Sequence, residues 1–316
     1  MANKKKSRYT PPTFQWQFLL PKYWLTWLTV TFLYLLSWLP FRMQMAIGRG
    51  VGRLLYKIMK SRRNVADRNL ELCFPEMPSQ QRADLVVKNF ENTGVAMLES
   101  GMAWWWPDWR VNPMIKIKGS EHVEKHINQG KGVLGLFTHA LPMEMLGRAV
   151  SQHWDYAGYY RPHNNPLLEW IQHNGRSQGK NEMIGKQDVK ALLSALNRGK
   201  FCIYLPDHDY GKKRSVFAPL FAVKEAATTT GTDLFASNKN AVTVPTKIQR
   251  LPNGQGYEVE FLPEFKDFPD TDPLKNAVKV NKWVEQSILT NVEQYMWVHR
   301  RFKTRPDHAP ENLYKK

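Results

Sequence analysis

Residues 132–144 read Gly132-Val-Leu-Gly-Leu-Phe-Thr138-His139-Ala-Leu-Pro-Met-Glu144. The first seven residues are a short apolar run, which predicts a buried strand. Pro142 has no N–H, disfavours helix at the residue before it and is tolerated in the first turn of a helix. This stretch therefore predicts a buried strand, a turn that carries His139, and a helix that starts near Pro142.

His139 and Glu144 are five positions apart. In a regular helix, five steps would leave their side chains about 140° apart, so the turn before Pro142 is what lets His139 swing toward Glu144. A histidine and a carboxylate in contact can act as a general base and the group that orients it. A structural explanation stays open, in which Glu144 stabilises the positive end of a helix dipole and His139 bonds to backbone.

Short apolar runs and amphipathic segments alternate from about residue 113 onward. Strands are predicted at 114–118, 132–138, 156–160, 201–205, 242–248 and 257–262, and helices at 121–129, 142–152, 166–173, 188–197 and 272–290. Two further amphipathic helices, at 42–59 and 79–98, precede them. This alternation predicts an α/β fold, a single layered domain with a mixed central sheet flanked by helices.

Charge is concentrated at the start of the chain. The 316 residues carry a net charge of +17, and residues 1–68 hold thirteen Lys or Arg against one acid. Such a field indicates an anionic partner, either nucleic acid or anionic lipid. The chain has only two cysteines, Cys73 and Cys202, which indicates a reducing compartment rather than a disulfide scaffold or a zinc site.

An apolar stretch inside the same region favours lipid. Residues 23–39 contain no charge and are rich in Trp, Tyr and Leu. They predict an N-terminal membrane helix, with 1–41 as a basic tail and anchor and 42–316 as the catalytic domain. The excess of positive charge after the helix places the bulk of the protein in the cytoplasm. At about 25 Å the stretch is slightly short of a bilayer core, so a helix lying in the membrane interface remains the alternative.

Three other patterns were candidates for a functional site. Gly175-Arg-Ser-Gln-Gly179 matches the letters of a serine-hydrolase elbow but lacks the strand before the serine, so we treat it as a chance match. Asp207 and Asp209 follow the 201–205 strand, where α/β sheets bind ligands, although an ordinary turn would also use such residues. Arg161 and Arg176 offer planar forks suited to phosphate, or to a structural carboxylate.

Together these segments resemble the late acyltransferases of lipid A biosynthesis in Gram-negative bacteria, within the lysophospholipid acyltransferase superfamily. The resemblance covers nearly the whole chain. It rests on Thr138-His139-x4-Glu144, Tyr160-Arg-Pro-x-x-Asn-Pro166, Arg176, Leu205-Pro-Asp-x-Asp-Tyr-Gly211, Ser215-Val-Phe217 and, most specifically, Gln294-Tyr-Met-Trp-Val-His-Arg-Arg-Phe-Lys-Thr-Arg-Pro306. The chain departs from the family at His208, where glutamine is common, and its Glu144 favours the lipid A branch over the phospholipid branch.

The resemblance implies a glycerolphosphate-acyltransferase-like fold and an enzyme of the bacterial inner membrane with its catalytic domain on the cytoplasmic face. A 3-hydroxyacyl hydroxyl of a lipid A precursor would attack the thioester of an acyl carrier protein. His139 would be the base and Glu144 its orienting partner, with no covalent acyl-enzyme. Arg176 is a third catalytic candidate: it or backbone N–H groups at the helix start would donate to the oxyanion, or Arg176 would instead contact phosphate or the carrier protein. Arg161, Asn165, Asp207 and Asp209 are expected to support substrate binding.

The resemblance implies no cofactor, no metal and no nucleic-acid partner. Two alternatives stay open on the sequence. One is transfer to a lysophospholipid, or to water as a thioesterase. The other is a non-enzymatic, membrane-attached nucleic-acid binder that uses the basic segment and its aromatic residues.

Overall fold

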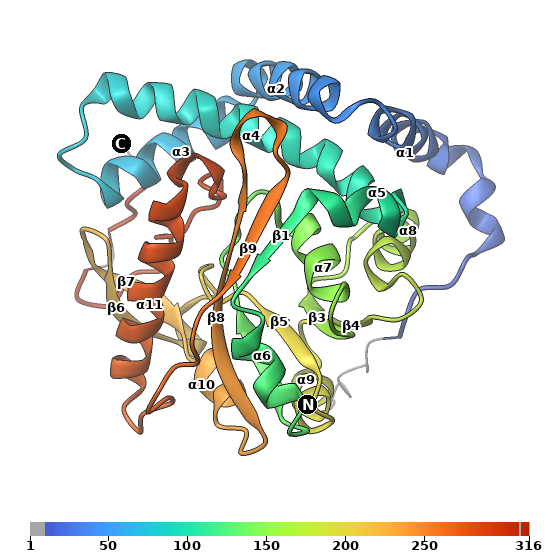
Figure 1. Ribbon diagram of the computed structural model, residues 1–316. Coiled ribbons are helices and arrows are strands. Elements are labelled where there is room, and N and C mark those ends of the chain that lie inside the picture. Colours follow the sequence, from blue (N-terminus) through green and yellow to red (C-terminus); the bar gives the residue numbers. More distant parts are fainter. Residues whose placement is uncertain (1–9, 310, 316) are drawn as a thin grey trace, which may run out of the picture.

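A computed structural model describes residues 10–309 and 311–315. Its centre is a seven-stranded sheet with the order β1-β9-β8-β2-β5-β3-β4 (Figure 1). The strands are β1 (Ile115–Lys118), β2 (Gly132–Leu136), β3 (Tyr156–Tyr160), β4 (Glu182–Gly185), β5 (Phe201–Tyr204), β8 (Ala241–Arg250) and β9 (Tyr257–Phe261). All neighbours pair in parallel except β8 and β9, which form an antiparallel hairpin. The mixed sheet predicted from the sequence is therefore confirmed.

The sheet is buried on both faces, because β2 contributes side chains to two separate cores. Leu134 and Leu136 belong to one core, and Val133 belongs to the other. The first core is completed by α3 (Lys60–Cys73), α9 (Val189–Asn197), α10 (Gly231–Ala236), α11 (Pro273–Thr290) and the hairpin of β6 (Ser215–Leu220) and β7 (Val223–Thr229). The second is completed by the end of α4 (Ser79–Trp105) with α5 (Asp108–Val111), α6 (Glu121–Ile127) and α7 (Met143–Ser151).

The N-terminal helices lie across one end of the domain, where Figure 1 shows α1 and α2 running alongside α4. α2 (Phe41–Ile58) approaches α4 at glycines on both helices. A Cβ on Gly94 would lie 2.1 Å from the Gly48 carbonyl oxygen and 2.4 Å from the Gly52 nitrogen. No larger residue fits this crossing unless the two backbones separate.

The first described segment folds back onto α8 (Pro166–Ser177). Phe18 and Val30 are buried against Leu167 and Ile171 of that helix. The Trp27 indole N–H donates to the Phe18 carbonyl at 2.8 Å. α1 (Trp24–Ser37) is thus held against the catalytic domain along one side and has no separate core of its own.

The predicted membrane-crossing helix takes a different form. α1 has 14 residues, or about 21 Å at 1.5 Å each, against about 30 Å for a bilayer core. Among residues 10–309 and 311–315, no helix is both long and apolar enough to cross a membrane. The apolar run is interrupted at Pro40, because α1 ends at Ser37 and a separate helix, α2, begins at Phe41. Lys4, Lys5, Lys6 and Arg8 of the predicted basic tail lie outside the described residues.

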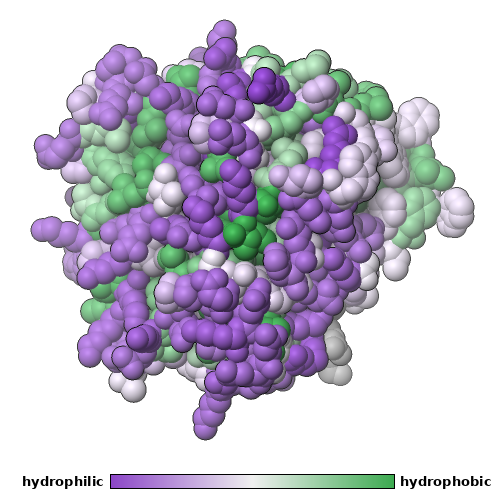
Figure 2. All heavy atoms as spheres, in the orientation of Figure 1, coloured by the Kyte–Doolittle hydropathy of each residue, from purple (hydrophilic) through white to green (hydrophobic). Residues whose placement is uncertain are grey.

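The outward side of this N-terminal segment remains apolar. The exposed side chains include Trp16, Trp24, Leu25, Leu28, Phe32 and Leu35, with Leu25 75% exposed. In Figure 2 green and pale spheres gather at the right-hand edge of the molecule, over this segment, whereas purple spheres dominate the face turned to the viewer. A soluble monomer rarely exposes so many large apolar side chains together, so this surface requires a covering environment.

Candidate active site

His139 lies on the turn between β2 and α7, as the apolar run and Pro142 predict. The segment after α11 fixes this turn by backbone hydrogen bonds. The Met296 N–H donates to the His139 carbonyl at 3.0 Å, and the Leu141 N–H donates to the Gln294 carbonyl at 2.7 Å. The C-terminal segment 294–297 therefore lies directly against the histidine turn, although about 150 residues separate the two in the sequence.

Two asparagines hold that C-terminal segment in place. Asn89 of α4 donates to the Tyr295 carbonyl at 2.7 Å, and Asn69 of α3 donates to the Trp297 carbonyl at 2.6 Å. Both side chains are buried. Sequence reasoning missed these asparagines, because an isolated polar residue on an amphipathic helix gives no signal of a distant backbone partner.

The orienting partner of His139 is Asp207. The His139 ring Nδ1 lies 2.7 Å from Asp207 Oδ1, and the His139 backbone N–H donates to Oδ2 at 2.9 Å. The Tyr295 hydroxyl donates to the same Oδ2 at 2.9 Å. His139 and Asp207 meet because β2 and β5 are adjacent parallel strands, and both residues follow the carboxyl ends of those strands.

The electrostatics keep Asp207 ionised. Burial alone would raise the pKa of Asp207, which is 2% exposed, but the charge of His139 and its two hydrogen bonds outweigh burial and hold that pKa well below its usual range. Burial, reinforced by repulsion from Asp207, raises the pKa of Tyr295 well above its usual value, so the phenol remains a hydrogen-bond donor. With Nδ1 occupied, Nε2 is the ring nitrogen left to accept a proton.

Glu144 does not take the orienting role predicted for it. Its carboxylate instead accepts from Arg176 Nε at 3.1 Å and Nη2 at 2.5 Å, and from the Trp104 indole at 2.9 Å. Burial would raise the pKa of Glu144, but attraction to Arg176 and these hydrogen bonds lower it. The two residues separate because Glu144 lies in the first turn of α7, which begins at Met143. His139 lies on the preceding turn, where its ring faces Asp207 at the carboxyl end of β5.

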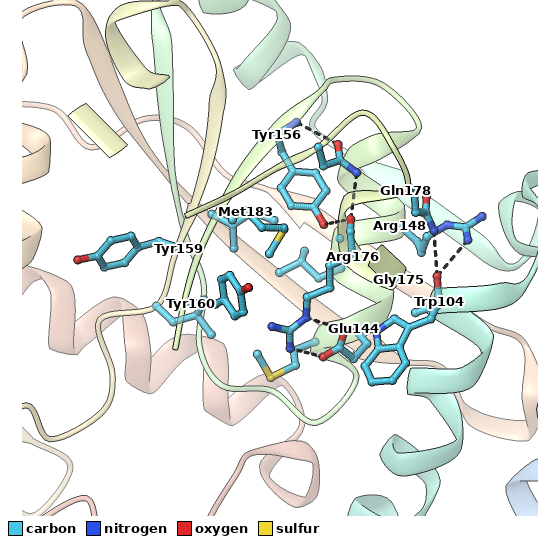
Figure 3. Close-up of a pocket in the computed structure, with 18 residues that line it drawn as sticks. Trp104, Glu144, Arg148, Tyr156, Tyr159, Tyr160, Gly175, Arg176, Gln178 and Met183 are labelled. Carbon is cyan, nitrogen blue, oxygen red and sulfur yellow. Dashed lines mark hydrogen bonds and ion pairs between the residues drawn. The ribbon is translucent and has the colours of Figure 1, made fainter. Parts of the chain in front are cut away.

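The Glu144–Arg176 ion pair lies at the wall of a mostly apolar pocket, to which Arg148, Gln178 and Asn181 also contribute (Figure 3). The pocket is lined by Trp104, Met143, Gly147, Tyr156, Gly158, Tyr160, Gly175, Met183, Ile203 and Leu205, among others. In Figure 3 the Arg176 fork faces Glu144 beside the Tyr160 ring, and Tyr159 points away from the pair. Met143 begins α7 directly after the turn that carries His139, and Leu205 lies two residues before Asp207, so part of the pocket lining is close in sequence to both residues.

The other three predicted binding residues are Asp209, Asn165 and Arg161, and the first two make contacts within the protein. Asp209 shapes its own turn, because its carboxylate accepts from the backbone N–H groups of Gly211 and Thr304. Asn165 caps α8 by accepting from Leu167 N–H at 3.0 Å, and its amide donates to Thr26 of α1. Arg161 is exposed on the loop after β3. Asp207 and Asp209 are therefore committed to internal contacts, and only Arg161 remains placed for an anionic ligand.

The described residues offer no activated nucleophile. Ser177 ends α8, and its hydroxyl donates to the Asn174 carbonyl one turn back, which confirms that the elbow pattern is a chance match. Cys73 and Cys202 are both buried, and burial raises the pKa of each thiol. The side chains of His139, Asp207 and His208 lie close enough for one metal ion, but both Asp207 oxygens already accept hydrogen bonds from His139 and Tyr295.

A histidine whose ring is held by a buried aspartate can act as a general base toward a hydroxyl group. The chain matches the family model for bacterial lipid A biosynthesis acyltransferases over residues 11–304. It belongs to that family and is an acyltransferase of lipid A biosynthesis, so the non-enzymatic alternative is wrong.

Relatives of known activity align along nearly their full length. The chain is 44% identical to the lipid A biosynthesis lauroyltransferase of Escherichia coli over 95% of this chain and 98% of that protein. It is 38% identical to the palmitoleoyltransferase of the same organism, with 93% and 95% covered. Identity to the myristoyltransferase is 26%, with 96% and 95% covered. These relatives carry different acyl groups in their names, so membership in the family does not by itself identify the acyl chain.

Proposed function

We propose that this enzyme transfers a fatty acyl chain from an acyl carrier protein thioester to a 3-hydroxyacyl hydroxyl of a lipid A precursor, with His139 as the general base. The observation that carries the proposal is the buried contact between His139 and Asp207 at one edge of the sheet. His139 Nε2 takes the hydroxyl proton while the oxygen attacks the thioester carbonyl. The C–S bond then breaks, and the imidazolium returns its proton to the departing thiolate.

Asp207 fixes the ring in the tautomer with the proton on Nδ1 and stabilises the imidazolium that forms. Because both of its oxygens are already hydrogen bonded, it does so without itself contacting substrate. A direct reaction without a covalent acyl-enzyme also agrees with the surroundings of the possible nucleophiles. Cys73 and Cys202 are buried, and the Ser177 hydroxyl is hydrogen bonded to a helix carbonyl.

The apolar pocket is the site that we assign to the acyl chain of the donor. Its walls are aromatic and aliphatic, and an apolar chain there replaces contact with water. The Glu144–Arg176 pair is the charged feature nearest the histidine turn on this wall. We propose that the pair acts as a unit, in which Glu144 holds the Arg176 fork and the fork positions the thioester.

We also propose that residues 1–41 attach the enzyme to the cytoplasmic face of the bacterial inner membrane by lying in the interface rather than by crossing it. The exposed Trp and Leu side chains of α1 supply the apolar contact. The outer face of α2 adds Arg42, Arg49, Arg53 and Lys57, all exposed, which attract anionic lipid. The same positive surface suits the phosphates of the acceptor and an acidic carrier protein.

Purified enzyme given an acyl carrier protein thioester and one acceptor at a time tests the reaction. We expect turnover with a lipid A precursor to exceed turnover with a lysophospholipid or with water, and to disappear in His139→Ala. Preference for lysophospholipid would make this a phospholipid-making member of the superfamily. Release of free fatty acid regardless of acceptor would make it a thioesterase.

Sedimentation with anionic phospholipid vesicles tests the attachment. Replacing Leu25 and Leu28 with Asn removes two exposed apolar side chains and should weaken binding by about tenfold or more, because each contributes about 1.5–3 kcal/mol when buried. The matched control is Leu234→Asn, an exposed leucine on α10 that should not matter. Equal binding by all three proteins would place the anchor elsewhere.

A further inference from the structure

Three histidine rings are stacked in a column that begins at His139. The His139 and His208 rings are 3.3 Å apart between centroids and 8° from parallel. The His208 and His299 rings are 3.9 Å apart and 11° from parallel. His208 follows Asp207 on the turn after β5, and His299 lies two residues after the C-terminal segment 294–297. Three separate parts of the chain therefore build the column.

The outer two rings are held neutral. Burial first, and then repulsion from a charged His139, lowers the pKa of His208 to about 2. Burial and the same repulsion lower the pKa of His299. The charged or titratable groups around the column are Asp207, Asp209 and Arg301, and only Asp207 contacts His139 directly. The column therefore presents an uncharged aromatic face to the His139 ring.

Face-to-face stacking is not the arrangement that two neutral aromatic rings prefer, because their quadrupoles repel. A cation over an aromatic face is attracted to it. In the proposed reaction His139 becomes an imidazolium only as the hydroxyl loses its proton. The stack is thus matched to the charged form of His139, while Asp207 stabilises that form from the ring edge.

We propose that His208 is a positioning residue, whose ring face holds the plane of His139 and stabilises the imidazolium formed during acyl transfer. The inference rests on the proposed role of His139 as general base. The isolation of the His208 ring supports it: its Nε2 is buried and has no hydrogen-bond partner among the described residues. A buried polar atom without a partner lowers the stability of the fold. The contact that the His208 ring does make is stacking on the rings of His139 and His299.

Two substitutions of similar size separate stacking from packing. His208→Phe keeps a flat aromatic face, and His208→Met fills the site with an apolar chain that has none. We expect His208→Met to lower kcat by about 3- to 30-fold, the range of a cation–aromatic contact, with the KM of each substrate nearly unchanged. His208→Phe should retain kcat within about threefold of wild type, because the face is preserved.

Thermal unfolding of each variant identifies any that fails to fold. In that case His299→Phe and His299→Met, one ring further from the base, should show the same order with a smaller difference. Equal kcat values for the Phe and Met variants would overturn the inference. If both variants were equally slow, the role would belong to a ring nitrogen of His208. His139→Ala in the same assay separates the two proposals, because activity without His139 would refute the general base itself.

Discussion

His139 and Glu144 are five residues apart, yet the structure assigns them to two different clusters. The His139 ring is hydrogen bonded to the buried carboxylate of Asp207, which also accepts a hydrogen bond from the Tyr295 hydroxyl. Glu144 is bound to a guanidinium and an indole at the wall of an apolar pocket. We propose that the first cluster moves a proton and that the second holds a charge in a fixed place. Proximity in sequence therefore does not predict which side chains pair, whereas strand adjacency brings His139 to Asp207.

The largest effect should come from the first cluster. His139→Ala removes the only proposed base and should lower kcat/KM by about 10²–10⁴-fold, while the protein remains folded. Ser177→Ala, at the end of α8, is the control and should be nearly as active as wild type. Steady-state kinetics on both variants decide the matter, and a well-folded His139→Ala enzyme with normal rates would end the proposal.

The second cluster should behave as one unit. Arg176→Met or Glu144→Leu leaves the partner as a largely buried charge without its ion-pair partner, which costs up to about 3–5 kcal/mol. The double variant should recover much of that stability, because both charges are gone. Loss of the positioned fork should lower kcat by about 10²-fold in each single variant and no further in the double, since groups that act together are not additive. Rate losses that multiply in the double variant would show that the two residues act independently.

A smaller effect is expected where the pocket is widened. Met183 is buried on β4, and its methyl group lies where a Cβ on Gly158 would be 2.8 Å away. Met183→Ala should shift the preferred donor toward a longer acyl chain by a few-fold in kcat/KM. Leu196→Ala, a similar truncation in the opposite core, controls for destabilisation. Unchanged selectivity in a folded Met183→Ala enzyme would move the acyl chain out of this pocket.

Much of the fold follows from the sequence, because periodicity and turn chemistry are local signals. β3 and the end of α11 coincide with the predicted bounds, and α7 begins one residue after Pro142 as expected. β4 and the β6–β7 hairpin were missed, because their runs are short and carry no clean alternation. The membrane-crossing helix was predicted from an uncharged apolar run and its flanking positive charges. Among the described residues no helix is long and apolar enough to cross a membrane, and the N-terminal segment packs on α8.

The site was only half predictable. His139 was identified as a candidate from residues and spacing, and the C-terminal segment was identified only through the family resemblance. The pairing of His139 with Asp207 depends on which strands are neighbours in the sheet. β2 lies beside β5 there, although β3 and β4 come between them in the sequence. A topological signal did exist, since His139 and Asp207 both follow strands that could lie side by side. Arg176 and Glu144 meet across 32 residues, and nothing local predicts that contact.

The smallest effect concerns acid sensitivity. Folded His208 stays neutral, with its pKa lowered from 6.5 to about 2, whereas an unfolded chain binds a proton there below pH about 6.5. The contribution of neutral His208 to the stability of the fold is therefore fully present above that pH and declines as the pH falls below it. His208→Phe should show a smaller drop in Tm between pH 7.5 and 5, although His299 keeps part of it. An identical drop in both proteins would show that His208 does not contribute to it.

The central claim is that Asp207, and not Glu144, holds the His139 ring. Proton NMR of enzyme labelled with ¹⁵N at histidine observes the Nδ1–H directly, and the His139→Ala spectrum assigns its signal. The hydrogen bond to Asp207 predicts a strongly downfield Nδ1–H resonance that persists in Glu144→Gln and is lost or shifted far upfield in Asp207→Asn. Loss of that resonance in Glu144→Gln, with Asp207→Asn unchanged, would contradict the account.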